Sequence, residues 1–86
     1  MTPTALLSDL VACPSVNPRH ATQFAPPHGE AAMVALLDKL LRSWGATTAI
    51  HDVHPGRPNL LATFPGKNPN RAILLDAHTD TVAVAI

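Results

Sequence analysis

The sequence has 86 residues, of which 47% are apolar and 14% charged, and its six basic and six acidic side chains leave no net charge. This length allows one small domain at most, and the charged fraction lies well below the roughly 25% of ordinary soluble proteins. No basic stripe suggests nucleic-acid binding, and no apolar run is long enough for a membrane span. The N-terminus has no signal-peptide pattern, and Cys13, as the only cysteine, cannot form an intrachain disulfide. We therefore expect a cytoplasmic protein with no nucleic-acid or membrane partner.

Two helices are predicted first. Thr2 can cap a helix that has Pro3 in its first position, and Pro14 ends it because proline cannot continue the hydrogen-bond ladder. A proline-rich loop follows over residues 15–29. Residues 30–44 form the clearest predicted helix, which Gly45 ends. Its apolar stripe, at helical spacing, consists of Met33, Leu36, Leu37, Leu40, Leu41 and Trp44.

Three strands are predicted after the helices, over residues 47–53, 59–64 and 71–77, with turns between them. The core of the third, residues 72–75, is apolar on both faces, which is typical of a central strand covered on both sides. The order of two helices and then three strands predicts an α/β fold. Two helices hardly supply both covering layers, and the chain closes on the apolar run 82–86, so we expect the fold to be incomplete.

Polar side chains gather directly after the third predicted strand. In extended backbone His78 and Asp80 point the same way, because side chains alternate along a strand. Imidazole is a common zinc ligand, and a nearby carboxylate can accept its other N–H and set its orientation. This His-x-Asp pair is therefore a candidate half of a metal site. The alternative interpretation is a polar strand exit in which the same two residues only form hydrogen bonds.

The other candidate residues are interpreted as structural. The remaining histidines are assigned to exposed turns and loops: His20, His28, His51 and His54. Cys13 has no basic neighbour in the sequence and is expected to be a small buried apolar residue. Ser15 lacks the Gly-x-Ser-x-Gly context of a serine nucleophile.

The run RAILLDAHTDTV, residues 71–82, resembles the first metal motif of the M20 family of zinc metallopeptidases and deacylases. Acetylornithine deacetylase, succinyl-diaminopimelate desuccinylase and aminoacylase are members. Three upstream segments resemble the family in the same order: LVACPSVNP, the helix from Gly29-Glu30 to Trp44-Gly45, and GRPNLLA. Two departures from the family pattern are Asp76-Ala77, where Ala-Gly is frequent, and Ala83, where proline is usual.

The resemblance implies the N-terminal part of a zinc-exopeptidase-type α/β/α catalytic domain. Residues 1–86 would then be a partial domain that stops after the first metal motif. His78 corresponds to a ligand of one of two zinc ions, for which Co²⁺ is a substitute, and Asp80 to the catalytic aspartate that orients this histidine. The implied substrate is an N-acyl amino acid or small peptide, with acetylornithine favoured, and the full-length protein would be a homodimer in some members.

Because a catalytic zinc needs about three protein ligands, and the remaining ligands and the general base cannot be placed in this chain, we expect the chain alone to be inactive. Two alternatives stay open. One is a different metal hydrolase of the metallo-β-lactamase type, which would need further histidines beside His78. The other is a non-catalytic pseudoenzyme fragment that binds a partner through an exposed sheet edge.

Overall fold

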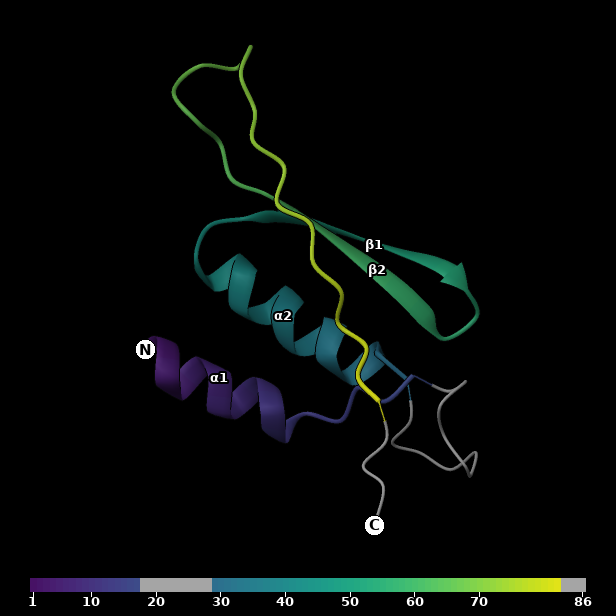
Figure 1. The fold of residues 1–86 in the computed structure, drawn as a ribbon. Coiled ribbons are helices and arrows are strands. Elements are labelled where there is room, and N and C mark those ends of the chain that lie inside the picture. The colour runs from purple at the N-terminus through teal and green to yellow at the C-terminus, as the bar shows by residue number, and fades with distance from the viewer. Residues whose placement is uncertain (18–28, 83–86) are drawn as a thin grey trace.

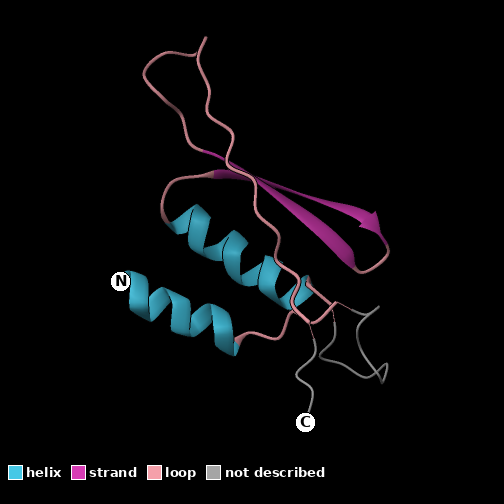
Figure 2. Cartoon of the chain, in the orientation of Figure 1, coloured by secondary structure: helices cyan, strands magenta, loops and turns pink. Residues whose placement is uncertain are grey.

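The computed structural model describes residues 1–17 and 29–82, and in them two helices precede one β-hairpin (Figure 1). The elements are α1 (Pro3–Ala12), α2 (Ala31–Ser43), β1 (Thr47–His54) and β2 (Arg57–Thr63). This is a small, incomplete α/β arrangement, as the sequence predicts (Figure 2). Most of the expected 15–29 loop and of the 82–86 run lies outside the described residues. No helix in the described ranges is long and apolar enough to cross a membrane.

Helix α1 begins as the sequence predicts. The Oγ1 atom of Thr2 accepts a hydrogen bond of 3.1 Å from the Ala5 N–H, and Pro3 occupies the first helical turn, where its missing N–H has no cost. The helix ends before Pro14, with Cys13 as its C-cap. None of its residues is buried. The helix is thus stabilised locally, and it adds little to the core.

Helix α2 supplies the core. Met33 and Val34 are its buried residues, with 7% and 2% of their surface exposed, whereas Trp44 at the C-cap is 51% exposed. The buried face therefore lies closer to the start of the helix than the predicted stripe, which included Trp44 and left out Val34. Gly45 adopts a positive φ of 97°, which side-chain-bearing residues disfavour, and its N–H bonds the Arg42 carbonyl to close the helix.

The two strands form an antiparallel hairpin in which Ile50 pairs with Leu60. Pro55 and Gly56 make the turn, in which Gly56 adopts a positive φ of 75° that side-chain-bearing residues disfavour. The hairpin packs on α2 through both strands. In Figure 1, α2 lies between this hairpin and α1.

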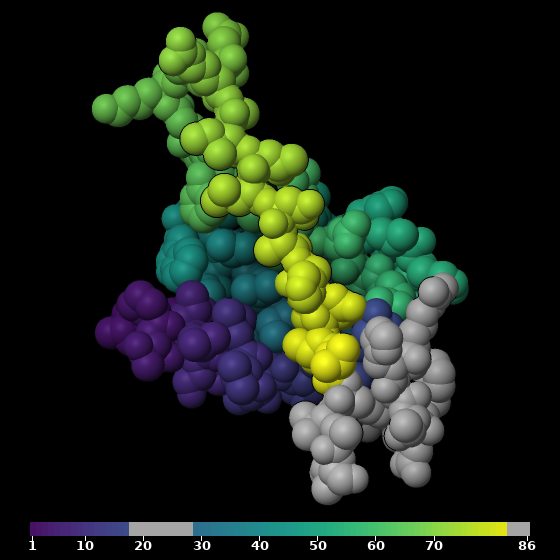
Figure 3. All heavy atoms as spheres, in the orientation of Figure 1, coloured from purple at the N-terminus to yellow at the C-terminus, as the bar shows by residue number. Residues whose placement is uncertain are grey.

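The prediction of a third strand is wrong for this structure. Residues 71–80 form no strand, and the bridge nearby is an isolated parallel one between Val16 and Thr81. A strand exists only through pairing, and here a groove separates this segment from β2. The apolar side chains that we expected to be covered on both faces are exposed: Ile73 by 91%, Leu74 by 81% and Leu75 by 89%. Figure 3 shows the segment, in yellow-green to yellow, on the surface of the molecule.

Candidate functional site

Two segments far apart in the sequence meet next to the predicted His-x-Asp pair. The Thr81 N–H donates to the Ser15 carbonyl over 2.9 Å, and the Asn17 N–H donates to the Thr81 carbonyl over 2.8 Å. The hydroxyl of Ser15, a residue only 2% exposed, donates to the Thr79 carbonyl over 2.6 Å. We call these residues, 15–17 and 79–81, the clamp. The clamp fixes the backbone on both sides of Asp80.

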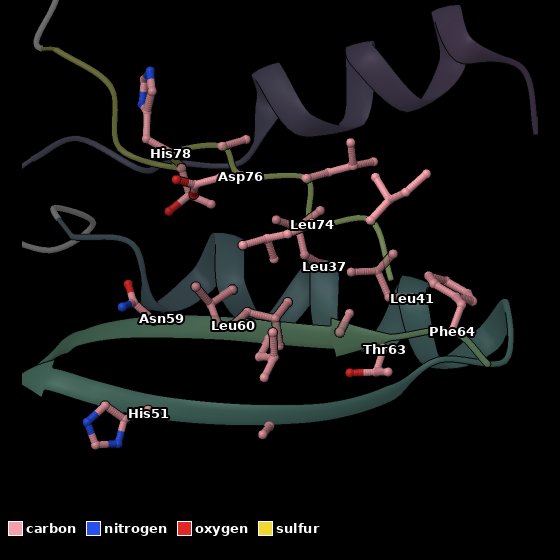
Figure 4. A pocket seen from close by; sticks show the side chains of 18 of the residues that line it. Leu37, Leu41, His51, Asn59, Leu60, Thr63, Phe64, Leu74, Asp76 and His78 are labelled. Atoms are coloured by element: carbon pink, nitrogen blue, oxygen red, sulfur yellow. The ribbon is translucent and has the colours of Figure 1, made fainter. Parts of the chain in front are cut away.

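The structure brings the two predicted site residues together. The His78 Nδ1 atom lies 3.0 Å from Asp80 Oδ1 and 3.0 Å from the Asp80 carbonyl oxygen. A neutral ring facing two acceptors through Nδ1 carries its proton there, so Nε2 is left with a free lone pair. The His78 side chain is 85% exposed, and its ring points away from β2 in Figure 4. Such a ring is oriented and accessible, as a metal ligand must be.

The second oxygen of Asp80 is also engaged. The side-chain amide of Asn17 donates to Oδ2 over 2.8 Å. This hydrogen bond is the main cause that lowers the pKa of Asp80; the His78 ring lowers it further, and partial burial opposes both. Asp80 is therefore an ionised acceptor at neutral pH.

A bidentate ion pair lies beside the clamp. Arg57, at the start of β2, donates from Nε and from a terminal nitrogen to the two carboxylate oxygens of Glu30, each over 2.6 Å. The hydrogen bond to Glu30 raises the pKa of Arg57, and the charges of Glu30 and Asp80 add to this effect. Glu30 is the N-cap of α2 and makes no capping bond, so its carboxylate ties the hairpin to the helix. The Arg57 guanidinium, although paired with Glu30, also interacts with the charge of Asp80.

A groove runs between β2 and the segment before His78 (Figure 4). Its lining is largely apolar and includes Leu37, Leu41, Leu60, Phe64 and Leu74. Asp76 and His78 also line it, close to the clamp. The groove joins an apolar wall to the polar pair, but the described residues do not close it off from solvent.

The other sequence candidates have structural roles in the part of the chain that the structure describes, but two expectations about their places need correction. His51 and His54 are exposed residues of β1, not of a turn, and His20 and His28 lie outside the described residues. Cys13 is a free thiol of intermediate exposure, so the expectation that it is buried is wrong. Ser15 is held as a donor within the clamp. Sequence reasoning missed the roles of Ser15 and Asn17, and the LVACPSVNP segment, which contains both, was the signal that could have found them.

The residues present fit one ligand of a zinc site. His78 offers an exposed Nε2 whose ring is oriented by a carboxylate, an arrangement common around zinc. Across residues 1–17 and 29–82, no three histidine, cysteine or carboxylate side chains gather as a complete metal site requires. The described residues thus provide an oriented imidazole and its support, and not a full coordination sphere.

The chain is similar to succinyl-diaminopimelate desuccinylases of Cereibacter sphaeroides. It is 37% identical over 82 residues to the enzyme of strain ATCC 17025, and 35% identical over 82 residues to those of strains ATCC 17029 and KD131. These residues are 95% of this chain and 19% of each relative, so the chain spans about a fifth of their length. No family model matches the chain. No solved structure matches it either.

Proposed function

We propose that residues 1–86 are part of the catalytic domain of an M20-type, metal-dependent hydrolase that cleaves the amide bond of an N-acyl amino acid or small peptide. One observation carries the proposal: the Nδ1 atom of His78 faces the Asp80 carboxylate, which leaves Nε2 exposed. The similarity to enzymes named desuccinylases supports amide-bond cleavage. Their name favours a succinyl group, whereas the sequence resemblance favoured acetylornithine, and the substrate assay below compares the two.

In the proposed mechanism His78, Asp80 and the clamp each have a distinct part. Asp80 accepts the Nδ1–H of His78, sets the plane of the ring and makes Nε2 a better donor to a metal. His78 would be one ligand of a zinc ion, with Co²⁺ as a substitute. Zinc bound there would polarise the substrate carbonyl and lower the pKa of water. The clamp keeps the backbone around Asp80 in place.

The same reasoning implies that the chain is inactive by itself. A catalytic zinc needs about three protein ligands and an open position, and His78 would supply one. The remaining ligands and the general base would come from residues other than those described here.

The test is a metal and activity measurement on the longest reading frame that contains these residues. We expect it to hydrolyse N-succinyl or N-acetyl amino acids, and His78→Ala to lower the bound zinc and the turnover by about 100-fold or more. His51→Ala is the matched control, because His51 is an exposed histidine of β1, and it should leave both unchanged. Full turnover in His78→Ala would defeat the assignment. The 86-residue chain should show neither activity nor stoichiometric zinc after dialysis.

A second candidate function is a non-catalytic binding module. The exposed apolar side chains of residues 73–75 favour it, since such patches often mark interaction surfaces. In that case neither substrate would be hydrolysed by the longer protein, and His78→Ala would change nothing. The activity measurement thus separates the two functions.

A further inference from the structure

Asp80 divides its two carboxylate oxygens between two partners. Oδ2 accepts from the Asn17 amide over 2.8 Å, and Oδ1 lies 3.0 Å from His78 Nδ1. The torsion that turns an aspartate carboxylate is broad and has no sharp rotamer. A hydrogen bond to one oxygen therefore sets where the other oxygen lies. In this structure the bond that sets it comes from Asn17.

The position of Asn17 is itself fixed by the backbone. Its N–H donates to the Thr81 carbonyl over 2.8 Å, and the preceding residue, Val16, forms the isolated parallel bridge with Thr81. The Val16 carbonyl accepts from the Gly29 N–H over 2.7 Å, which ties the clamp to the start of α2. Asn17 thus approaches Asp80 from a stretch of backbone that is hydrogen-bonded to Thr81 and to Gly29.

Packing contributes little to the orientation of the His78 ring, because 85% of its side chain is exposed. The contacts of Nδ1 with Asp80 are then what turns the ring. Of the two acceptors, the backbone carbonyl is held by the chain, whereas the carboxylate can rotate away unless Oδ2 is held. The orientation of the His78 ring accordingly depends on the Asn17 amide, which acts on it through the Asp80 carboxylate.

We propose that Asn17 is a positioning residue of the candidate site: its amide holds the Asp80 carboxylate so that Nδ1 of His78 faces Oδ1 and Nε2 stays free. That the free Nε2 serves to bind a metal rests on the proposed function. The positioning itself is a property of this chain and can be measured without metal or substrate.

The experiment measures the tautomer of His78 in the 86-residue chain by the ¹⁵N shifts of its ring nitrogens. At a pH of about 8.5 an ordinary imidazole is neutral, so the shifts report which nitrogen carries the proton. The spectrum of His78→Gln assigns the ring. We expect the Nδ1–H form to predominate in the native chain. Asn17→Asp and Asn17→Ala should each lower the ratio of Nδ1–H to Nε2–H by about fivefold, the effect of one hydrogen bond.

Asn70→Asp is the matched control. It makes the same change of charge in a turn where the backbone N–H of Asn70 bonds Asn68, and the His78 ratio should stay at the native value. Amide shifts of the β1–β2 hairpin, which the clamp does not form, report whether each variant is folded. If Asn17→Asp loses those signals and is therefore unfolded, the tautomer ratio of Asn17→Ala tests the proposal instead, because alanine adds no charge beside Asp80. An unchanged ratio in a folded Asn17 variant would overturn the proposal, whatever the outcome of the activity assay.

Discussion

Glu30 and Arg57 form the best-aligned ion pair of the described residues. Both bonds are 2.6 Å long, and the Glu30 side chain is only 6% exposed. The pair of Asp38 and Arg42 differs: a single bond of 3.2 Å joins neighbouring turns of α2, and the Arg42 side chain is 63% exposed. Bidentate geometry away from water strengthens an ion pair, whereas exposed pairs are screened. The two pairs should therefore contribute very differently to stability.

A double-mutant cycle tests this difference. We expect Glu30→Gln and Arg57→Gln each to lower the free energy of unfolding, and the double variant to lose clearly less than their sum. The matched cycle on Asp38 and Arg42 should give a coupling of about 0.3–0.5 kcal/mol. Urea unfolding of the two cycles measures both couplings. Equal couplings would show that the Glu30–Arg57 geometry adds nothing beyond an ordinary helix pair.

For single residues, the sequence predicts which side chains could bind a metal better than it predicts the distant residues that those side chains contact. His78 and Asp80 are two residues apart, so their proximity follows from local geometry alone. The donor that holds Asp80 lies 63 positions earlier, and no local rule connects the two residues. The bond between Glu30 and Arg57 likewise depends on how the hairpin packs against α2, which no local rule predicts.

The two helices differ in what holds them. α1 has a side-chain cap and no buried residue, whereas α2 lacks a side-chain cap and buries Met33 and Val34. Burial of apolar surface is the larger contribution, because isolated helices of this length are marginal in water. The stability of the chain is therefore concentrated in α2 and the hairpin that it contacts.

One substitution made in both helices tests that statement. Val34 is 2% exposed and Val11 is 77% exposed, and both become alanine. Val34→Ala should destabilise the chain by about 1–3 kcal/mol through lost burial and a residual cavity. Val11→Ala should change the stability by less than about 0.5 kcal/mol, since alanine is the better helix former. Urea unfolding measures both, and equal losses would contradict the assignment of the core to α2.

Elements that neighbouring residues specify could be predicted from the sequence. The state of residues 71–77, which depends on a distant strand, could not. Thr2 with Pro3 and the Pro55-Gly56 turn specify their elements through neighbouring residues. The 71–77 segment has the composition of a strand, yet a strand depends on a partner beside it. Composition gives the preference of a segment for strand structure. In this chain a groove lies between residues 71–77 and β2, so the segment has no strand beside it to pair with.

The molecule as a whole is open for its size. Its accessible surface is 7192 Å², whereas a compact protein of this mass exposes about 4,900 Å². Its radius of gyration is 14.8 Å, against about 12 Å for a compact domain of this length. The excess includes large apolar side chains such as Ile73, Leu74 and Leu75. An apolar surface of this kind accords with the low charged fraction of the sequence.

An exposed leucine tests the consequence for solubility. Leu74 is 81% exposed, so Leu74→Lys should change the free energy of unfolding by less than about 0.5 kcal/mol. The same change should reduce binding of a hydrophobic dye and concentration-dependent association, because it interrupts the apolar patch. Leu7→Lys is the control, at a residue of α1 that is 61% exposed and does not line the groove. A large loss of stability in Leu74→Lys would mean that the groove is closed in solution.

The clamp also has a consequence for the order of folding. The bond between Ser15 and Thr79 joins residues 64 positions apart, whereas the contacts within the helices and the hairpin are local. Helices and hairpins form within about 10 μs, but closing a long loop carries an entropy penalty that grows with its length. We therefore expect the α2–hairpin unit to assemble first and the backbone around Asp80 to become ordered after it. By the same energetics we expect the clamp to open before the α2–hairpin unit does, so that the backbone on which the His78–Asp80 pair stands is exposed to local unfolding first.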